Sequence, residues 1–189
     1  MSVPPSTTQF SVPRPHRADA RRNFDALLAA ARDAFNRDGI DVPLEDIARQ
    51  AGVGIGTLYR NFPTRSDLVE AVYVSEIEEL LQAARNESER EPWPALEAWL
   101  LRFSGYVATK LAMLQGLNKD SEMLRTCRAA MWEAANPLFE RAQEAGEVRP
   151  DTNLDDVMRL VSGVTGGHYD CDEQRARVLT LALEAIRVR

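Results

Sequence analysis

The chain has 189 residues, of which 44% are hydrophobic and 28% charged, and its formal net charge is −6. This composition is typical of a globular protein and argues against wholesale disorder. A chain of this length can bury a substantial core, as one large domain or two small ones. No apolar run approaches the roughly 18 residues that a membrane-spanning helix needs, so we expect no membrane partner.

Two further features bear on the compartment. The N-terminus lacks the apolar core of a signal peptide, so we expect a cytoplasmic protein. Cys127 and Cys171 are too few and too far apart for a disulfide framework, which agrees with a reducing environment.

Charge is distributed unevenly along the chain. Residues 1–65 hold nine arginines against seven acidic residues, a net of +2, which leaves 14 basic against 22 acidic residues for the remainder, a net of −8. A mildly basic first third on an acidic body can present one face to phosphates while the body favours solubility.

Residues 1–19 are predicted to form a flexible basic tail, because Pro, Ser and Thr are frequent and no period is present. Its Arg14-Pro15-His16-Arg17 stretch leaves open a second role, as a basic arm that reaches an adjacent minor groove.

Three helices are predicted next, over about 20–38, 44–51 and 55–61. The first has a buried face at helical spacing, made by Phe24, Leu27, Leu28, Ala31 and Phe35. Gly39 is expected to end it with a left-handed conformation. Gly52-Val53-Gly54 is expected to form the turn between the second and third helices, and Pro63 to stop the third.

The rest of the chain is also predicted to be helical. A long helix over 65–90 has Thr64 or Ser66 as its N-cap, and the next begins near Pro94 and closes at Gly116. The pattern then predicts a short helix near Asn118, a long one over 121–145 that is interrupted or kinked at Asn136-Pro137 and ended by Gly146, and final helices over 154–165 and 172–188. No strand-like alternation is found, so the predicted fold class is all-α with about nine helices.

Residues 44–62 have the pattern of a helix-turn-helix, in which a supporting helix and a tight turn carry a helix that enters the DNA major groove. The positions that would fix the angle between the two helices are Ile47, Ala48, Ala51, Val53, Leu58 and Phe62. The residues predicted to bind DNA are Ile55, Gly56, Thr57, Tyr59, Arg60, Asn61 and Arg65.

Each of these side chains has a use on DNA. Thr57, Tyr59 and Asn61 can bond phosphate oxygens, and Arg60 can pair with a guanine edge or a phosphate. Ile55 can pack on a thymine methyl group, and Gly56 lets the backbone approach closely.

The residue types D-I-A-x-x-A-G-V, then G-T-L-Y-x-x-F-P and a basic residue at 65, resemble the N-terminal domain of the TetR family of transcriptional regulators. The resemblance covers about 20–78 and implies phosphate contacts by Tyr59, Asn61 and Arg65, with Ile55, Gly56, Thr57 and Arg60 facing the groove. Pro43 and Gly54 depart from the family, which often has Thr and Ser there as helix caps. The stretch 142–151 is similar to a linker in one group of TetR C-terminal domains.

What the family implies is a homodimer that binds a palindromic double-stranded DNA operator, usually to repress. A small-molecule effector, unknown here, enters the C-terminal domain at 79–189 and releases the DNA. Family analogy places the dimer interface on the last two helices, at Val157, Leu160, Val161, Val164, Val178, Leu179, Ala182, Leu183 and Ile186. These helices carry more apolar surface than one face needs, but burial within one chain is the alternative.

Bulky and soft residues on the middle helices can line an apolar effector cavity or be plain core. The set we expect at such a pocket is Trp99, Phe103, Tyr106, Met123, Cys127 and Met131.

Nothing in the sequence indicates a catalytic site, a cofactor or a metal centre. His168, Asp170, Cys171 and Asp172 include ligand types but fall in one short loop without ligand-pair spacing. We therefore expect a DNA-binding regulator and no enzyme. The alternatives are a dimeric helical ligand-binding protein without DNA binding and a transcriptional activator of the same fold.

Overall fold

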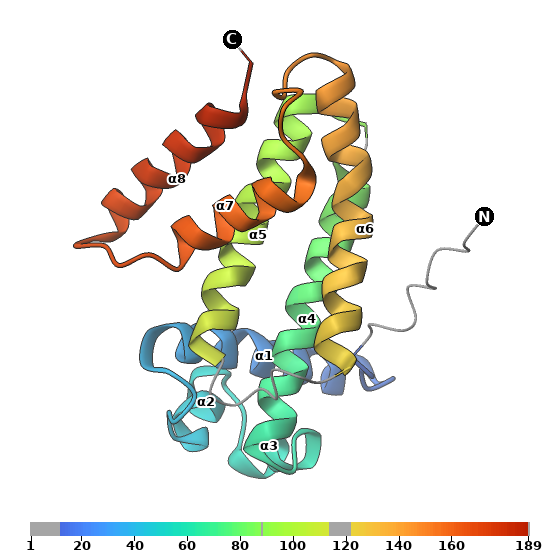
Figure 1. Cartoon of the computed structure of the whole chain (residues 1–189). Helices are drawn as coiled ribbons and strands as arrows, with labels where there is room; N and C mark the ends of the chain where they lie inside the picture. The colour runs from blue at the N-terminus through green and yellow to red at the C-terminus, as the bar shows by residue number, and fades with distance from the viewer. Residues whose placement is uncertain (1–11, 88, 114–121, 189) are drawn as a thin grey trace. The chain divides into compact units, whose positions relative to one another are not determined.

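The computed structural model describes residues 12–87, 89–113 and 122–188, with the Met123 side chain excepted (Figure 1). The helices in this part of the chain are α1 (Ala18–Asp38), α2 (Leu44–Gln50), α3 (Ile55–Asn61), α4 (Arg65–Asn86), α5 (Pro92–Met113), α6 (Glu122–Glu144), α7 (Leu154–Thr165) and α8 (Asp172–Ile186). One isolated bridge joins Val148 and Arg187, and no strand is present within these ranges. The all-α prediction is confirmed.

Most helix bounds lie close to those predicted, and α3 and α7 begin and end at the predicted residues. The helix expected near Asn118 and the closing role of Gly116 lie outside the described residues. In the residues that are described, no helix is long and apolar enough to span a bilayer.

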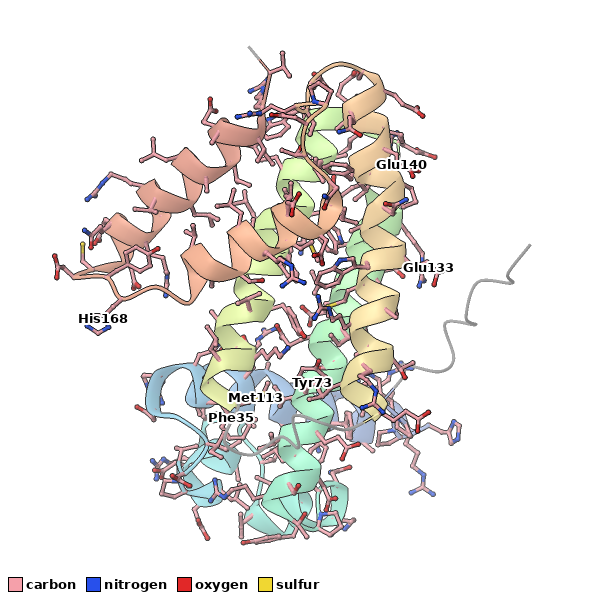
Figure 2. The ribbon with its side chains drawn as sticks, viewed as in Figure 1. Phe35, Tyr73, Met113, Glu133, Glu140 and His168 are labelled. Carbon is pink, nitrogen blue, oxygen red and sulfur yellow. The ribbon has the colours of Figure 1, made fainter. Side chains whose placement is uncertain are left out.

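Of the two alternatives predicted at Asn136-Pro137, an interruption or a kink, the interruption is wrong, because α6 continues through Pro137 as one helix. Proline removes the hydrogen bond to the carbonyl of Glu133, four residues earlier. Pro137 and Glu133 are both exposed. Water can therefore satisfy the freed carbonyl on the outer side of α6, where Glu133 and Glu140 point away from the protein (Figure 2).

The described residues divide into two compact units. Unit 1 takes in those of Met1–Glu78 and Thr109–Ser121, and unit 2 those of Glu79–Ala108 and Glu122–Arg189. The predicted domain boundary, between residues 78 and 79, falls within α4. The predicted C-terminal domain, 79–189, also takes in the end of α5, which belongs to unit 1. There the Asn36 amide donates to Thr109 Oγ1 at 3.1 Å, and Met113 is buried.

The core of unit 1 is the predicted apolar face of α1 packed on the helix-turn-helix. Phe24 and Phe62 have ring centroids 5.0 Å apart. α1 packs on α2, and α2 packs on α3. The buried side chains include Phe24, Leu27, Leu28, Ala31, Phe35, Ile47, Ala48, Leu58 and Phe62, with Tyr73 of α4 and Met113 of α5 (Figure 2).

Local sequence sets the ends of these helices. Gly39 (φ 79°) follows α1 and Gly52 (φ 69°) opens the turn between α2 and α3, both in conformations that favour glycine. The N–H of Val53 closes that turn on the carbonyl of Ala48 at 3.0 Å. Thr64 and Asp67 bond each other's backbone N–H groups reciprocally, so Thr64, one of the two predicted candidates, is the N-cap of α4.

Val12 and Arg14 of the predicted flexible tail contact unit 1. The N–H of Val12 donates to Glu78 Oε1 at 2.8 Å, and Val12 is buried. Arg14 pairs with Asp25 at 3.0 Å and with Glu78 at 2.9 Å. These contacts join Val12 and Arg14 to α1 and α4.

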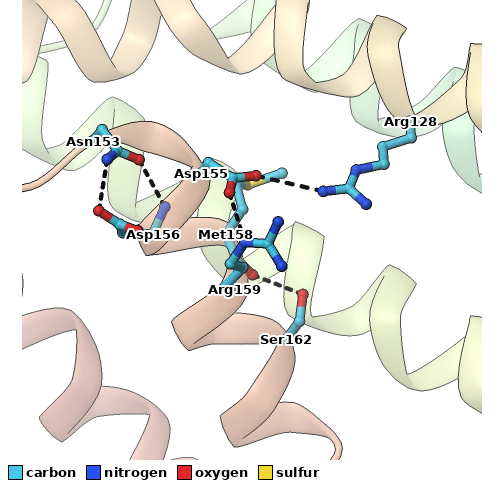
Figure 3. Close-up of polar contacts among 7 residues, drawn as sticks. All are labelled: Arg128, Asn153, Asp155, Asp156, Met158, Arg159 and Ser162. Carbon is cyan, nitrogen blue, oxygen red and sulfur yellow. Dashed lines mark hydrogen bonds and ion pairs between the residues drawn. The ribbon is translucent and has the colours of Figure 1, made fainter.

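In unit 2, α7 starts at a polar cap and is linked to α6 by an ion pair (Figure 3). The Asn153 side chain accepts from the N–H of Asp156 at 2.9 Å. Asp155 pairs with Arg159 at 2.6 Å and with Arg128 of α6 at 3.4 Å. The hydrogen bond from Arg159 is the largest cause that holds the pKa of Asp155 below its ordinary value.

Candidate nucleic-acid interface

The seven-residue helix α3 divides its side chains between the core and solvent. Leu58 has no exposed surface, whereas Tyr59 is 45% exposed and Ile55 is 36% exposed. Gly56 and Arg60 are exposed and Thr57 is half-buried. Because Leu58 and the following Phe62 hold the inner side, the predicted groove-facing residues occupy the outer side and the first turn.

Asn61 is the least available of the predicted contacts on α3. Its side-chain amide donates to the carbonyl of Thr57 at 2.8 Å, one turn earlier in the same helix. The carbonyl oxygen of an asparagine side chain is an acceptor and cannot bond a phosphate oxygen. A phosphate contact by Asn61 therefore requires an amide hydrogen that this intrahelical bond leaves unused.

Arg65 has a structural role that the sequence pattern did not indicate. Its Nη1 donates to the carbonyl of Ile40 at 2.5 Å and to that of Val42 at 2.6 Å. These carbonyls lie in the loop between α1 and α2, so one end of this guanidinium holds the loop against the start of α4. Residues 40 and 65 are far apart in the sequence and meet only in the folded protein. No sequence pattern could therefore have predicted this contact.

The two departures from the family pattern are visible at the helix starts. Pro43 is the N-cap of α2 and offers no side-chain bond to it. Gly54 is the N-cap of α3 with an extended conformation, and its carbonyl accepts from the N–H of Thr57 at 2.8 Å. The N-terminal amides of α3 therefore have no side-chain cap.

The predicted pocket residues form an aromatic and sulfur-bearing cluster in unit 2. Trp99, Phe103 and Tyr106 of α5 and Cys127 and Met131 of α6 are all buried. The rings of Trp99 and Phe103 are stacked with centroids 5.6 Å apart, and Tyr106 is 5.8 Å from Phe103. The side chain of the sixth predicted residue, Met123, lies outside the described structure.

Trp132 of α6 belongs to this cluster and was not predicted as a pocket residue. Its ring meets that of Phe103 edge-on, with centroids 6.3 Å apart. The guanidinium of Arg128 lies over the Trp132 ring, 4.7 Å from the ring centroid. A bulky residue one position after Met131 gives no signal that distinguishes it from core, so the sequence did not single it out.

The nine residues predicted for a dimer interface fall into two groups. Val157, Val161, Ala182, Leu183 and Ile186 are buried in the single chain, where α7 packs against α8. Leu160 is exposed, and Val164, Val178 and Leu179 are half-buried. Leu181 of α8 was missed because it lies off the predicted apolar row, yet it is 68% exposed.

The loop residues considered for a metal do not converge on a site. His168, Asp170, Cys171 and Asp172 are all exposed, and His168 lies at the tip of the α7–α8 loop (Figure 2). Within the described ranges, no three His, Cys, Asp or Glu side chains are grouped so that they could hold one metal ion.

The described residues are built of helices, and the partly exposed helix α3 stands in a helix-turn-helix on compact unit 1, which defines a helix-turn-helix protein with a helical body. Two family models match it: that of bacterial regulatory proteins of the tetR family over residues 27–72, and that of the SbtR-like transcriptional regulator C-terminal domain over residues 91–188. The chain belongs to the TetR family of transcriptional regulators.

Solved structures and curated relatives agree with this assignment. The TetR transcriptional regulator SCO0520 from Streptomyces coelicolor is 38% identical with a TM-score of 0.75, over 86% of this chain and 97% of that one. A TetR transcription regulatory protein from Mycobacterium vanbaalenii is 31% identical with a TM-score of 0.71, over 92% and 100%. The HTH-type transcriptional regulator SAR0097 from Staphylococcus aureus is 28% identical over 109 residues, and the match spans 56% of each chain.

Arg65→Ala tests the structural role of this arginine. Removing two charge-assisted hydrogen bonds from the loop carbonyls should lower the free energy of unfolding by about 1.5–3 kcal/mol. Arg60→Ala is the matched control, because Arg60 is exposed on the outer side of α3, and it should change that free energy by less than about 0.5 kcal/mol. Chemical denaturation measures both. Equal losses in the two variants would show that the contacts with Ile40 and Val42 do not stabilise unit 1.

Proposed function

We propose that this protein is a cytoplasmic, sequence-specific DNA-binding transcriptional regulator that places α3 in the major groove of an operator, most simply as a repressor. The observation that carries the proposal is the division of α3 between buried Leu58 and exposed Ile55, Tyr59 and Arg60. A polar and aromatic surface on a helix whose inner side is fixed suits groove binding.

The exposed groups of α3 suit different parts of a duplex. Arg60 has the donor geometry for a guanine edge, and Ile55 suits a thymine methyl group. The Tyr59 hydroxyl suits a phosphate oxygen, as do the hydroxyl of half-buried Thr57 and the uncapped amides at the start of the helix. Gly56 adds no side chain between the helix and the DNA. Specificity would then rest mainly on Arg60 and Ile55, and positioning on the remaining groups.

We further propose a homodimer, because two-fold symmetry matches a palindromic operator with half-sites about one helical turn apart. The interface is proposed on the side chains of α7 and α8 that the single chain leaves partly or fully uncovered: Leu160, Val164, Val178, Leu179 and Leu181. Val157, Val161, Ala182, Leu183 and Ile186 would support that surface from beneath.

The effector is proposed to be a small, largely apolar molecule that enters among Trp99, Phe103, Tyr106, Cys127 and Met131. Ring faces and sulfur atoms in this cluster supply the polarisable lining that such ligands bind. Because α4 and α5 each contribute residues to both units, a ligand in unit 2 can change the helices that also build unit 1.

Two substitutions on α3 test the DNA contacts. Tyr59→Phe should weaken binding to every duplex by about 0.5–1.5 kcal/mol, because it removes a hydrogen bond to the backbone. Arg60→Ala should relax the preference at one base pair by about 1–3 kcal/mol. Fluorescence anisotropy with a selected operator and its single-base variants measures both, with Arg177→Ala, an exposed arginine of α8, as the control. A wild-type protein that binds no duplex at low salt would overturn the proposed function.

The dimer is tested by placing a charge on its proposed interface. Leu181→Glu and Leu160→Glu should shift the protein to monomers, because each would bury an unpaired carboxylate between subunits. Leu101→Glu is the matched control on α5, where Leu101 is 48% exposed. Analytical ultracentrifugation measures the mass. A wild-type monomer at micromolar concentration, or dissociation caused only by Leu101→Glu, would contradict the proposed interface.

The effector cluster is tested by a thermal-shift screen of apolar compounds. A compound that binds only the folded protein should stabilise it by about 2.7 kcal/mol at 100 times its Kd, and should release the operator. Phe103→Leu should weaken its binding, whereas Phe139→Leu, at another buried phenylalanine of unit 2, should leave it unchanged. Binding that is insensitive to Phe103→Leu would place the ligand elsewhere.

A further inference from the structure

The start of α1 carries a row of arginines that the helix-turn-helix does not account for. Residues 1–13 contain no charged side chain, so the positive charge of the N-terminal segment is concentrated in Arg14, Arg17, Arg21 and Arg22. The contacts of these four arginines divide them into two pairs.

Two of them have carboxylate partners within the protein. Arg14 is held by Asp25 and Glu78, and Arg22 pairs with Asp19. Arg17 and Arg21 are exposed and form no ion pair with any described residue. Their charge is therefore available for a partner outside the chain.

The helical register places this second pair on the side of α1 that packs against the DNA-binding motif. Arg17, Arg21, Phe24 and Leu28 are separated by four, three and four residues, which is the spacing of one helix face. Phe24 and Leu28 are buried in the core of unit 1. The face that packs on the helix-turn-helix thus continues, beyond the edge of the core, as two exposed arginines.

The contact between Phe24 and Phe62 gives the position of this surface relative to α3. Phe62 directly follows α3, and its ring centroid is 5.0 Å from that of Phe24. At about 1.5 Å per residue, Arg21 lies about 5 Å and Arg17 about 10 Å along α1 from Phe24. Both arginines therefore lie on the continuation of the α1 face that contacts Phe62, the residue that directly follows α3.

The position of Arg17 and Arg21 at the start of α1 does not stabilise that helix. Positive charge near a helix N-terminus opposes the helix dipole, and Arg17 as N-cap residue gives α1 no side-chain hydrogen bond. Two cations kept where they do not stabilise the helix, and next to a surface proposed to bind DNA, suit an anionic partner.

We propose that Arg17 and Arg21 form a second phosphate-binding site, which grips the DNA backbone beside the groove that α3 occupies. This inference rests on the proposed function and adds a sequence-independent contact to it. The attachment of Arg14 and Val12 fixes the approach to this site, so the contact is made by a positioned helix start and not by a free arm.

The test compares the full-length double variant Arg17→Ala/Arg21→Ala with the wild type and with Arg22→Ala. Binding to a selected operator and to an unrelated duplex is measured by anisotropy between 50 and 200 mM salt. Loss of two phosphate contacts should make the slope of log K against log salt shallower by about 1.8. Over this fourfold range the wild-type affinity should therefore fall about 12-fold more than that of the double variant.

Three further results are expected. The base preference of the double variant should be unchanged, its melting temperature should not fall, and Arg17→Lys/Arg21→Lys should restore the slope. An unchanged slope in the double variant, or an equal change in Arg22→Ala, would overturn the second site while leaving the proposed function in place. A wild-type protein that shows no salt-dependent DNA binding would instead overturn the proposed function itself.

Discussion

The contact between Phe24 and Phe62 is the constraint on which the surface proposed to bind DNA depends. It joins the first long helix to the residue that directly follows α3, and with buried Leu58 and Ile47 it fixes the inner side of the motif. Because this side is apolar and closely packed, the opposite side of α3 is free to carry groups that serve no packing purpose. Arg17 and Arg21 lie on the same face of α1 as Phe24, toward the start of that helix.

The two units carry different features, two of them on the surface and one buried. Unit 1 presents polar, aromatic and basic groups at α3 and at the start of α1. Unit 2 holds an aromatic cluster between α5 and α6, and an apolar surface on α7 and α8 that includes Leu181. Residues 1–65 carry a net charge of +2 and residues 66–189 a net charge of −8, so the positive charge that can attract DNA phosphates is concentrated in the first third of the chain.

Much of the fold could be predicted because strong local signals mark the ends of its helices. Gly54 and Pro63 delimit α3, and Gly39 and Gly52 mark turns whose positive φ values favour glycine. The bond of Arg65 to the carbonyls of Ile40 and Val42 could not be predicted, because it depends on tertiary proximity. Periodicity identified the apolar rows of α7 and α8, but it could not show which of these side chains are buried within the single chain. Val157, which is buried, and Leu160, which is exposed, were therefore both predicted at the dimer interface.

The most direct measurement of the central claim is oxidative footprinting of Tyr59 with and without a selected operator duplex. Tyr59 is 45% exposed in the free chain, whereas Tyr73 is buried and serves as the internal reference. We expect the reactivity of Tyr59 to fall on binding while that of Tyr73 stays low. Unchanged reactivity of Tyr59 in a saturated complex would contradict the account, because the DNA would then occupy another surface.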